Sequence, residues 1–452
     1  MQYRKYQVQE SNANSNHKKI NISRLKFISS YSALSLLLLA ALFFVSCNNN
    51  SEDGQIITKD NAPTNLLEGR WRGSIGLGSE ELNFNFDITE QQDGKLKMTI
   101  LNADERIDVE DITFTEDSVF IKLPVFDSEL KGKWHPMRIM GEWHDYARGD
   151  DYQLPFYARY NDSTRFDTKT VNDPDVNIEG RWQGMFIAKD RSGKDDAIGE
   201  FKQNGPIISG TFMTPTGDYR YLEGLANGKE ISLSAFDGAH AFLFKAEMGE
   251  GGDLVGTFWS GTHYEADMYF YRSDTATLAD PNKMTLLKKG YDKLAFSFPN
   301  LKGKKVTLDD PKYKGKVVLV QIMGTWCPNC MDETVFYSDV YKTYKDQGLE
   351  VIALAYEKAN NLQSAKPQLE RYQERFDIQY DMLYAGKATK EGASESLPML
   401  DEVKSFPTTI FIDRNGEVRR IHTGFTGPAT SEYDNFVEDF KGFLEGLLQE
   451  AT

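Results

Sequence analysis

Cysteine is scarce in this chain of 452 residues, which contains only Cys47, Cys327 and Cys330. A scaffold held by disulfides needs more cysteines, spread along the chain. Two of the three stand in one Cys-x-x-Cys, and the third follows an apolar run. The sequence therefore predicts no long-range structural disulfide.

Basic residues are also outnumbered, with 52 Lys and Arg against 68 Asp and Glu and a net charge of −16. Binding to nucleic acid requires a basic surface, so no nucleic-acid partner is expected. The length exceeds what one hydrophobic core serves, which favours two or three domains.

The N-terminus has the layout of a signal peptide. A polar stretch with several Lys and Arg precedes an apolar run at residues 33–45, and Ser46 stands before Cys47. The run is short for a membrane span. Residues 44–47 (FVSC) resemble a bacterial lipobox, whose cysteine is lipidated and becomes the new N-terminus, although Phe44 replaces the usual Leu. The alternative is an uncleaved signal anchor with an incidental cysteine.

Both interpretations place the rest of the chain on the periplasmic side of the cell envelope. We expect a lipoprotein signal peptide at residues 1–46 and a polar tether at 47–65, which anchors the protein to a membrane through Cys47. Residues 48–54 are polar and acidic. Their similarity to lipoprotein sorting signals favours the outer over the inner membrane.

Residues 66–275 contain an internal repeat of about 110 residues. The hexapeptide EGRWRG at residues 68–73 recurs as EGRWQG at 179–184, and FYAR at 156–159 is echoed by YFYR at 269–272. Alternating apolar and polar residues, as at 82–88, predict β-strands joined by tight turns. We expect an all-β region built by duplication, with repeats at 66–165 and 176–275. They form either two small barrels or two sheets of one sandwich.

The Gly-x-Trp at the start of each repeat resembles the first strand of calycins. Trp71 and Trp182 are interpreted mainly as core residues that close the base of each β-unit, with ligand lining as the alternative. Residues 276–295 read as a linker with a short helix around 284–294.

The remaining residues, 296–452, alternate strand and helix patterns. An apolar run at 316–323 predicts a strand buried on both faces, and it leads directly into Cys327-Pro328-Asn329-Cys330. Pro328 suits the first turn of a helix. Further strands are expected at 351–356, 380–384 and 406–413, with helices at 364–376 and 431–447. This order of elements is that of an α/β thioredoxin-like fold.

The GTWCxxC motif and the Phe-Pro-Thr-Thr segment at 406–409 resemble the TlpA/ResA-like family of membrane-tethered thiol–disulfide oxidoreductases. The resemblance covers about a third of the chain, and lipoproteins with a β-rich N-terminal region of this kind look typical of Bacteroidetes-type bacteria. The resemblance to this family implies that the peptide bond before Pro407 is cis and faces the redox pair. The backbone of Phe406 would then be exposed to a substrate strand. Trp326 is expected to cover the pair, or else only to pack.

Thiol–disulfide exchange needs an attacking thiolate and a resolving thiol. Cys327 at a helix N-terminus is expected to attack, because the helix dipole stabilises its thiolate. Cys330, one turn further, is expected to be more buried and to resolve the mixed disulfide.

The resemblance also implies a carboxylate beside the cysteines, at Glu357, which would carry the proton of Cys330; a surface Glu is the alternative. Gln321 lies six residues before Cys327, at the position where classical thioredoxins have a buried Asp. Its neutral amide cannot transfer that proton, which shifts the expected role to Glu357.

A Cys-x-x-Cys can also bind a metal ion, here either zinc or copper. Zinc usually requires four ligands, and no third thiol lies near the pair in the sequence. Copper sites on this fold usually add a histidine at a matching position, and His422 is the only histidine after Cys330. We expect no metal and no cofactor.

The leading hypothesis is a reductase of disulfides in exported proteins, such as apocytochromes, supplied by a membrane electron donor. The alternative is a binding lipoprotein whose β-repeats capture a ligand or partner. A peroxide-reducing activity ranks third, because the chain lacks the peroxiredoxin spacing.

Overall fold

The computed structural model describes residues 65–166 and 174–451. All of them belong to one compact unit that begins at Ala62. The expected signal peptide and Cys47 lie outside the described residues. Among the helices that are described, none combines the length and the apolar character that crossing a membrane requires.

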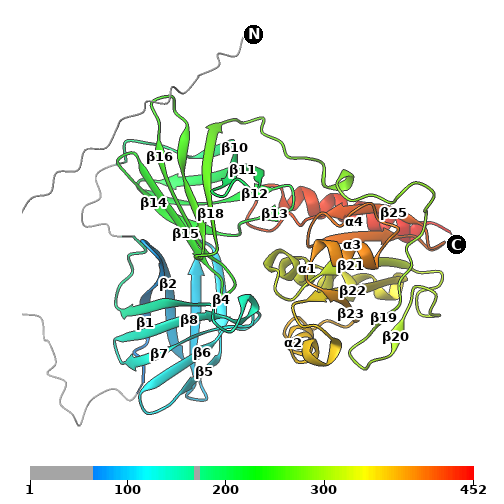
Figure 1. The fold of residues 1–452 in the computed structure, drawn as a ribbon, viewed down its shortest axis with the longest axis horizontal. Coiled ribbons are helices and arrows are strands. Elements are labelled where there is room, and N and C mark those ends of the chain that lie inside the picture. The colour runs from blue at the N-terminus through cyan, green and yellow to red at the C-terminus, as the bar shows by residue number, and fades with distance from the viewer. Residues whose placement is uncertain (1–64, 167–173, 452) are drawn as a thin grey trace, which may run out of the picture. The chain divides into compact units, whose positions relative to one another are not determined.

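The first β-unit is a nine-stranded antiparallel sheet with the order β4-β3-β2-β1-β9-β8-β7-β6-β5 (Figure 1). Its strands are β1 (Gly69–Leu77), β2 (Glu80–Glu90), β3 (Leu96–Asn102), β4 (Glu105–Val109), β5 (Asp111–Phe114), β6 (Ser118–Lys122), β7 (Ser128–His135), β8 (Arg138–Asp145) and β9 (Gln153–Tyr160). The apolar residues that alternate at 82–88 are buried in β2, as the pattern predicts, but Asn83 and Asn85 between them are buried too. A short 3₁₀ helix, η2 (Tyr146–Arg148), joins β8 to β9.

The second β-unit has the order β11-β10-β18-β17-β16-β15-β14-β12-β13, and β11 also pairs with β12. That pairing closes the sheet into a barrel. Its strands are β10 (Gly180–Ala188), β11 (Lys194–Asn204), β12 (Ile207–Thr214), β13 (Gly217–Asp218), β14 (Leu222–Asn227), β15 (Glu230–Phe236), β16 (Ala241–Met248), β17 (Leu254–Ser260) and β18 (Tyr264–Arg272).

Trp71 and Trp182 hold equivalent positions in the two units. Each indole is completely buried, and its Nε1 donates to the carbonyl four residues earlier, at 2.9 Å for Leu67 and 2.8 Å for Ile178. Burial of this extent agrees with the interpretation of both as core residues.

The two β-units share core residues. Phe236 of β15 packs on Phe84 of β2 with ring centroids 4.5 Å apart, and it belongs to the apolar cluster of the first unit. Asn102 Nδ2 also donates to the Phe236 carbonyl at 2.9 Å.

The C-terminal region is a five-stranded sheet with the order β23-β22-β21-β24-β25. β21 runs parallel to β22 and antiparallel to β24, which is the thioredoxin arrangement. The strands are β21 (Val317–Met323), β22 (Leu349–Glu357), β23 (Asp381–Lys387), β24 (Thr408–Ile412) and β25 (Val418–Thr423), and a small hairpin, β19 (Phe298–Pro299) and β20 (Lys305–Val306), precedes them. Every residue of β21 is buried.

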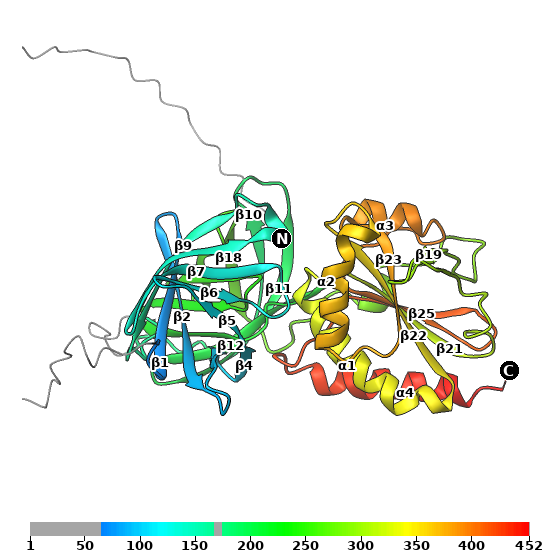
Figure 2. The same ribbon diagram turned by 90° about the horizontal axis from the view of Figure 1, so that it is seen from below.

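The helices are α1 (Pro328–Tyr344), α2 (Leu362–Arg375), α3 (Lys390–Ser396) and α4 (Tyr433–Gln449), with short 3₁₀ turns η3 (Pro281–Lys283) and η4 (Lys345–Gln347). Figure 2 shows α1 and α4 together along one side of the sheet. Phe336 of α1 and Phe440 of α4 pack there with ring centroids 4.9 Å apart.

The prediction of a helix around residues 284–294 is wrong. After η3 this segment is irregular, because its backbone pairs with the loop before β24: Lys288 N donates to Met399 O at 2.8 Å. Gly290, with φ of 94°, also leaves the helical region. The short helix α3 was not predicted from the sequence.

Candidate active site

The redox turn, residues 324–330, connects the end of β21 to the first turn of α1. Cys327 is the N-cap of α1, with φ −106° and ψ 110°, and Pro328 follows in the first turn. The Cys327 Sγ accepts a hydrogen bond from the Cys330 backbone N–H at 3.2 Å. An amide and the positive end of a helix therefore point at this sulfur, which favours its anion.

Cys327 and Cys330 are joined in a disulfide, with Cα atoms 5.2 Å apart. Cys330 is completely buried, whereas Cys327 retains 6% of its surface. Of the two cysteines, Cys327 is therefore the one that keeps a part of its surface exposed.

The loop before β24 lies against the sulfur of Cys327. The Phe406–Pro407 peptide bond is cis, as the resemblance implies. The carbonyl oxygen of Phe406 is 3.7 Å from Cys327 Sγ. Pro407 and Phe406 are therefore brought to the redox pair from a segment about 80 residues away.

Trp326 is tied to the end of β22. Its Nε1 donates to the Tyr356 carbonyl at 2.8 Å, and its ring meets that of Phe406 edge-on with centroids 5.4 Å apart. The indole thus links the residue before the redox turn to the cis-proline loop.

Glu357 is the last residue of β22 and is buried, which excludes the alternative of a surface Glu. Its carboxylate accepts hydrogen bonds from the Thr325 amide at 2.9 Å and the Thr325 hydroxyl at 2.8 Å. Burial nevertheless raises the pKa of Glu357 to about 7. The side chain can therefore hold or release a proton near neutral pH, and its partner Thr325 lies two residues before Cys327 in the chain.

A second buried acid, Glu333, was missed by the sequence reasoning. It lies on α1 one turn beyond Cys330 and accepts hydrogen bonds from Gln321 Nε2 and Thr409 Oγ1, both at 2.9 Å. Complete burial raises the pKa of Glu333 to about 7. Its spacing of three residues from Cys330, on the inner face of a helix, was the signal available in the sequence.

Gln321 connects this acid to the redox pair. Its amide nitrogen lies 3.5 Å from the Cys330 carbonyl oxygen in addition to its bond with Glu333. The neutral side chain of Gln321 thus contacts the carboxyl group of Glu333, which lies on α1.

A cavity of about 570 Å³ opens at Cys327. One wall comes from the thioredoxin-like region and includes Trp326, Glu357 and Lys358. The other comes from loops of both β-units, among them Tyr146 with Arg148 and His240. The sequence reasoning did not anticipate that the β-units line the redox site.

No group of three or more His, Cys, Asp or Glu side chains suited to a metal ion occurs in residues 65–166 and 174–451. The Nδ1 of His422, the histidine that a copper site would need, lies 3.0 Å from Asn282 Oδ1. Burial lowers the pKa of His422 to about 4.

Comparisons with known proteins agree with this geometry. The AhpC/TSA family model matches residues 290–421. The thiol-disulfide oxidoreductase ResA of Geobacillus kaustophilus is 33% identical over 129 residues, which are 28% of this chain and 66% of that protein. ResA of Bacillus cereus is 31% identical over 174 residues, 38% of this chain and 83% of its own. The chain belongs to the ResA-like thiol–disulfide oxidoreductases.

Among solved structures, a thiol:disulfide interchange protein of the thioredoxin family from Chlorobium tepidum is similar to the ResA-like region. The two sequences are 22% identical, and the match covers 36% of this chain and 98% of the Chlorobium chain, with a TM-score of 0.27.

The buried acid Glu333 should make the stability of this ResA-like chain depend on pH. Folded Glu333 keeps its proton up to about pH 7, whereas an unfolded Glu loses it near pH 4.5. Stability should therefore fall as pH rises through this window. We compare the free energies of unfolding of Glu333→Gln and the wild type by urea unfolding. We expect their difference to shift by about 2–3 kcal/mol in favour of Glu333→Gln between pH 5 and pH 8.

The matched control is Glu374→Gln on the exposed side of α2, which should show no such gain. An equal difference between Glu333→Gln and the wild type at both pH values would contradict the account.

Proposed function

We propose that this chain is a membrane-anchored oxidoreductase of the cell envelope that reduces disulfides in exported proteins. The observation that carries the proposal is the asymmetry of the redox pair. Cys327 caps α1 and borders the cavity, while Cys330 lies behind it without exposure.

In the proposed reaction the Cys327 thiolate attacks one sulfur of a substrate disulfide and releases the other as a thiolate. Cys330 then loses its proton and attacks Cys327, which forms the Cys327–Cys330 disulfide and frees the second substrate thiolate. Two electrons pass to the substrate. A dithiol donor at the membrane returns the chain to its reduced form.

Glu357 is the proposed acceptor of the proton. It lines the same cavity as Cys327, and its raised pKa matches the pH at which a proton must move. Glu333 lies on the closed side of the pair and is the second candidate for this role.

Trp326, Phe406 and Pro407 form the proposed binding edge for substrate. The Phe406 carbonyl beside Cys327 offers an acceptor to an extended chain. Exported proteins with exposed disulfides, including apocytochromes, present such segments while unfolded.

The proposed location is the periplasmic face of a membrane, with the outer membrane favoured. The support is the lipobox-like sequence at Cys47 and the polar tether after it.

We also propose that the β-units arose by duplication. The shared motifs and the common sequence of pairings support this, since β2-β1-β9-β8-β7-β6 corresponds to β11-β10-β18-β17-β16-β15.

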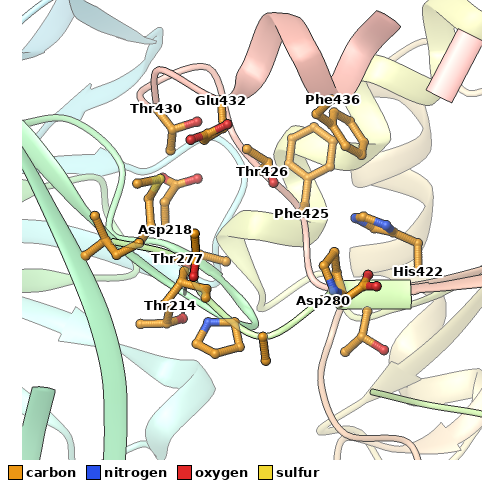
Figure 3. A pocket seen from close by; sticks show the side chains of 18 of the residues that line it. Thr214, Asp218, Thr277, Asp280, His422, Phe425, Thr426, Thr430, Glu432 and Phe436 are labelled. Atoms are coloured by element: carbon orange, nitrogen blue, oxygen red, sulfur yellow. Dashed lines mark hydrogen bonds between the residues drawn. The ribbon is translucent and has the colours of Figure 1, made fainter. Parts of the chain in front are cut away.

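The alternative function, ligand binding by the β-region, is favoured by a second cavity of about 470 Å³. Figure 3 shows Phe425 and Phe436 of the thioredoxin-like region on one side of it, and Thr214 and Asp218 of the second β-unit on another. The mixed lining suits a small amphipathic molecule.

Trapping distinguishes the two functions. In cells that express Cys330→Ser, Cys327 should accumulate mixed disulfides with exported proteins, because the resolving thiol is missing. The adducts are detected by non-reducing gels and mass spectrometry. The Cys327→Ser, Cys330→Ser double variant is the control and should form none. If no adducts form and Cys327→Ser leaves the phenotype of the wild type, the ligand-binding function is favoured instead.

The role of Glu357 predicts a change in the pH–rate profile. Glu357→Gln should slow exchange near pH 7 several-fold and remove the inflection there, because the amide cannot take up a proton. Stopped-flow reduction of a model disulfide by the reduced chain measures this. Glu333→Gln should keep the inflection, and the opposite pattern would move the role to Glu333.

A further inference from the structure

Arg220, between β13 and β14 of the second β-unit, is a buried cation with an uncommon backbone conformation. Only 7% of its surface is exposed, and its φ is 57°. Non-glycine residues rarely adopt this left-handed region unless the surroundings hold them there. The position thus combines two costs of folding, a strained backbone and a desolvated charge.

The guanidinium of Arg220 connects three parts of the chain. Nη1 contacts Asp332 Oδ2 of α1 at 2.5 Å. Nη2 pairs with Glu105 of β4 in the first β-unit, and Nε lies 3.7 Å from Asp237 Oδ2, just after β15. One side chain therefore joins both β-units to the helix that carries the redox pair.

The groups around Arg220 are mostly acidic. Besides Glu105, Asp237 and Asp332, the buried Asp218 accepts from the Arg220 amide at 2.7 Å and from the Gly427 amide at 2.8 Å. The one other basic group facing this cluster in the described contacts is His240, 3.1 Å from Asp237. Buried carboxylates need a cation, so Arg220 holds the cluster together.

The backbone of the same loop packs against the redox turn itself. A Cβ on Gly217 would lie 2.0 Å from Nδ2 of Asn329, the residue between Pro328 and Cys330. The loop can approach Asn329 this closely only because residue 217 is glycine. Contacts at Asn329 and Asp332 thus fix the first turn of α1 on both sides of Cys330.

We propose that Arg220 is a positioning residue for the redox pair, through which the β-units hold the first turn of α1. This rests on the proposed exchange at Cys327 and extends it to the β-region. The first turn carries the Cys330 N–H that donates to Cys327 Sγ at 3.2 Å. Holding that turn keeps the amide aimed at the sulfur and preserves the reactivity of the thiolate.

Two substitutions of Asp332 separate positioning from a simple charge effect. Asp332→Ala removes both the contact and the negative charge, whereas Asp332→Asn removes the charge but keeps an oxygen that accepts from Arg220. If position matters, Asp332→Ala weakens the Cys330 amide contact and Asp332→Asn restores most of it. If only charge matters, both variants should favour the Cys327 thiolate equally.

The experiment uses the full chain with Cys47→Ser and Cys330→Ser, in which Cys327 is the remaining thiol. The rate of its reaction with iodoacetamide is measured from pH 5 to pH 10. We expect Asp332→Ala to react at least three-fold more slowly at pH 7 with a higher midpoint, and Asp332→Asn to stay within two-fold of its parent. Arg220→Met should slow the reaction like Asp332→Ala.

The matched control is Arg165→Met. Arg165 is also a buried arginine and joins the β-units through Ser234 and Leu101, without a contact to α1. It should leave the alkylation rate unchanged. Circular dichroism and melting temperature verify folding, and if Arg220→Met does not fold, the two Asp332 variants carry the test alone.

Equal rates for Asp332→Ala and Asp332→Asn, or faster reaction in both, would overturn the proposal. Slowing by Arg165→Met to the same extent would overturn it too, because the effect would then be general loosening. No substrate enters the assay, so its result is independent of which disulfide the chain reduces.

Discussion

The chemistry that we propose for this protein depends on one hydrogen bond, from the Cys330 amide to the Cys327 sulfur at 3.2 Å. It exists because β21, buried along its whole length, ends at the point where α1 begins, so that Cys327 becomes the helix cap. The same turn places Cys330 inside the core. A single local geometry thus separates Cys327, for which we propose the attacking role, from Cys330, for which we propose the resolving role.

Two buried acids surround that turn from different sides. Glu357 reaches it through Thr325 and borders the cavity, while Glu333 reaches it through Gln321 and has no exposure. Burial raises the pKa of each to about 7. The redox pair is therefore placed between two groups that can hold a proton at neutral pH, and Glu357, which borders the cavity, is the one that we propose exchanges it. The β-units also contact this site. Their loops line the cavity at Cys327, and Arg220 forms an ion pair with Asp332 of α1.

Local patterns in the sequence predicted the redox turn, the order of strands and helices around it, and the burial of Trp71 and Trp182, because apolar periodicity and capping residues act over short distances. The helix expected at 284–294 failed because a distant loop pairs with that segment. Glu333 was missed because its importance comes from Gln321 and Thr409, which are brought to it only by folding. The Arg220 cluster joins residues 105, 220, 237 and 332, and no pattern along the chain indicates that they meet.

The central claim is that the Cys327–Cys330 disulfide exchanges while the protein is folded. The most direct measurement equilibrates the full chain with defined ratios of reduced and oxidised dithiothreitol, quenches with acid and counts alkylated cysteines by mass. The account predicts a single reversible transition in which both thiols appear together, with the circular dichroism of the folded protein retained. A disulfide that stays closed under these conditions, or opens only when the protein unfolds, would contradict it.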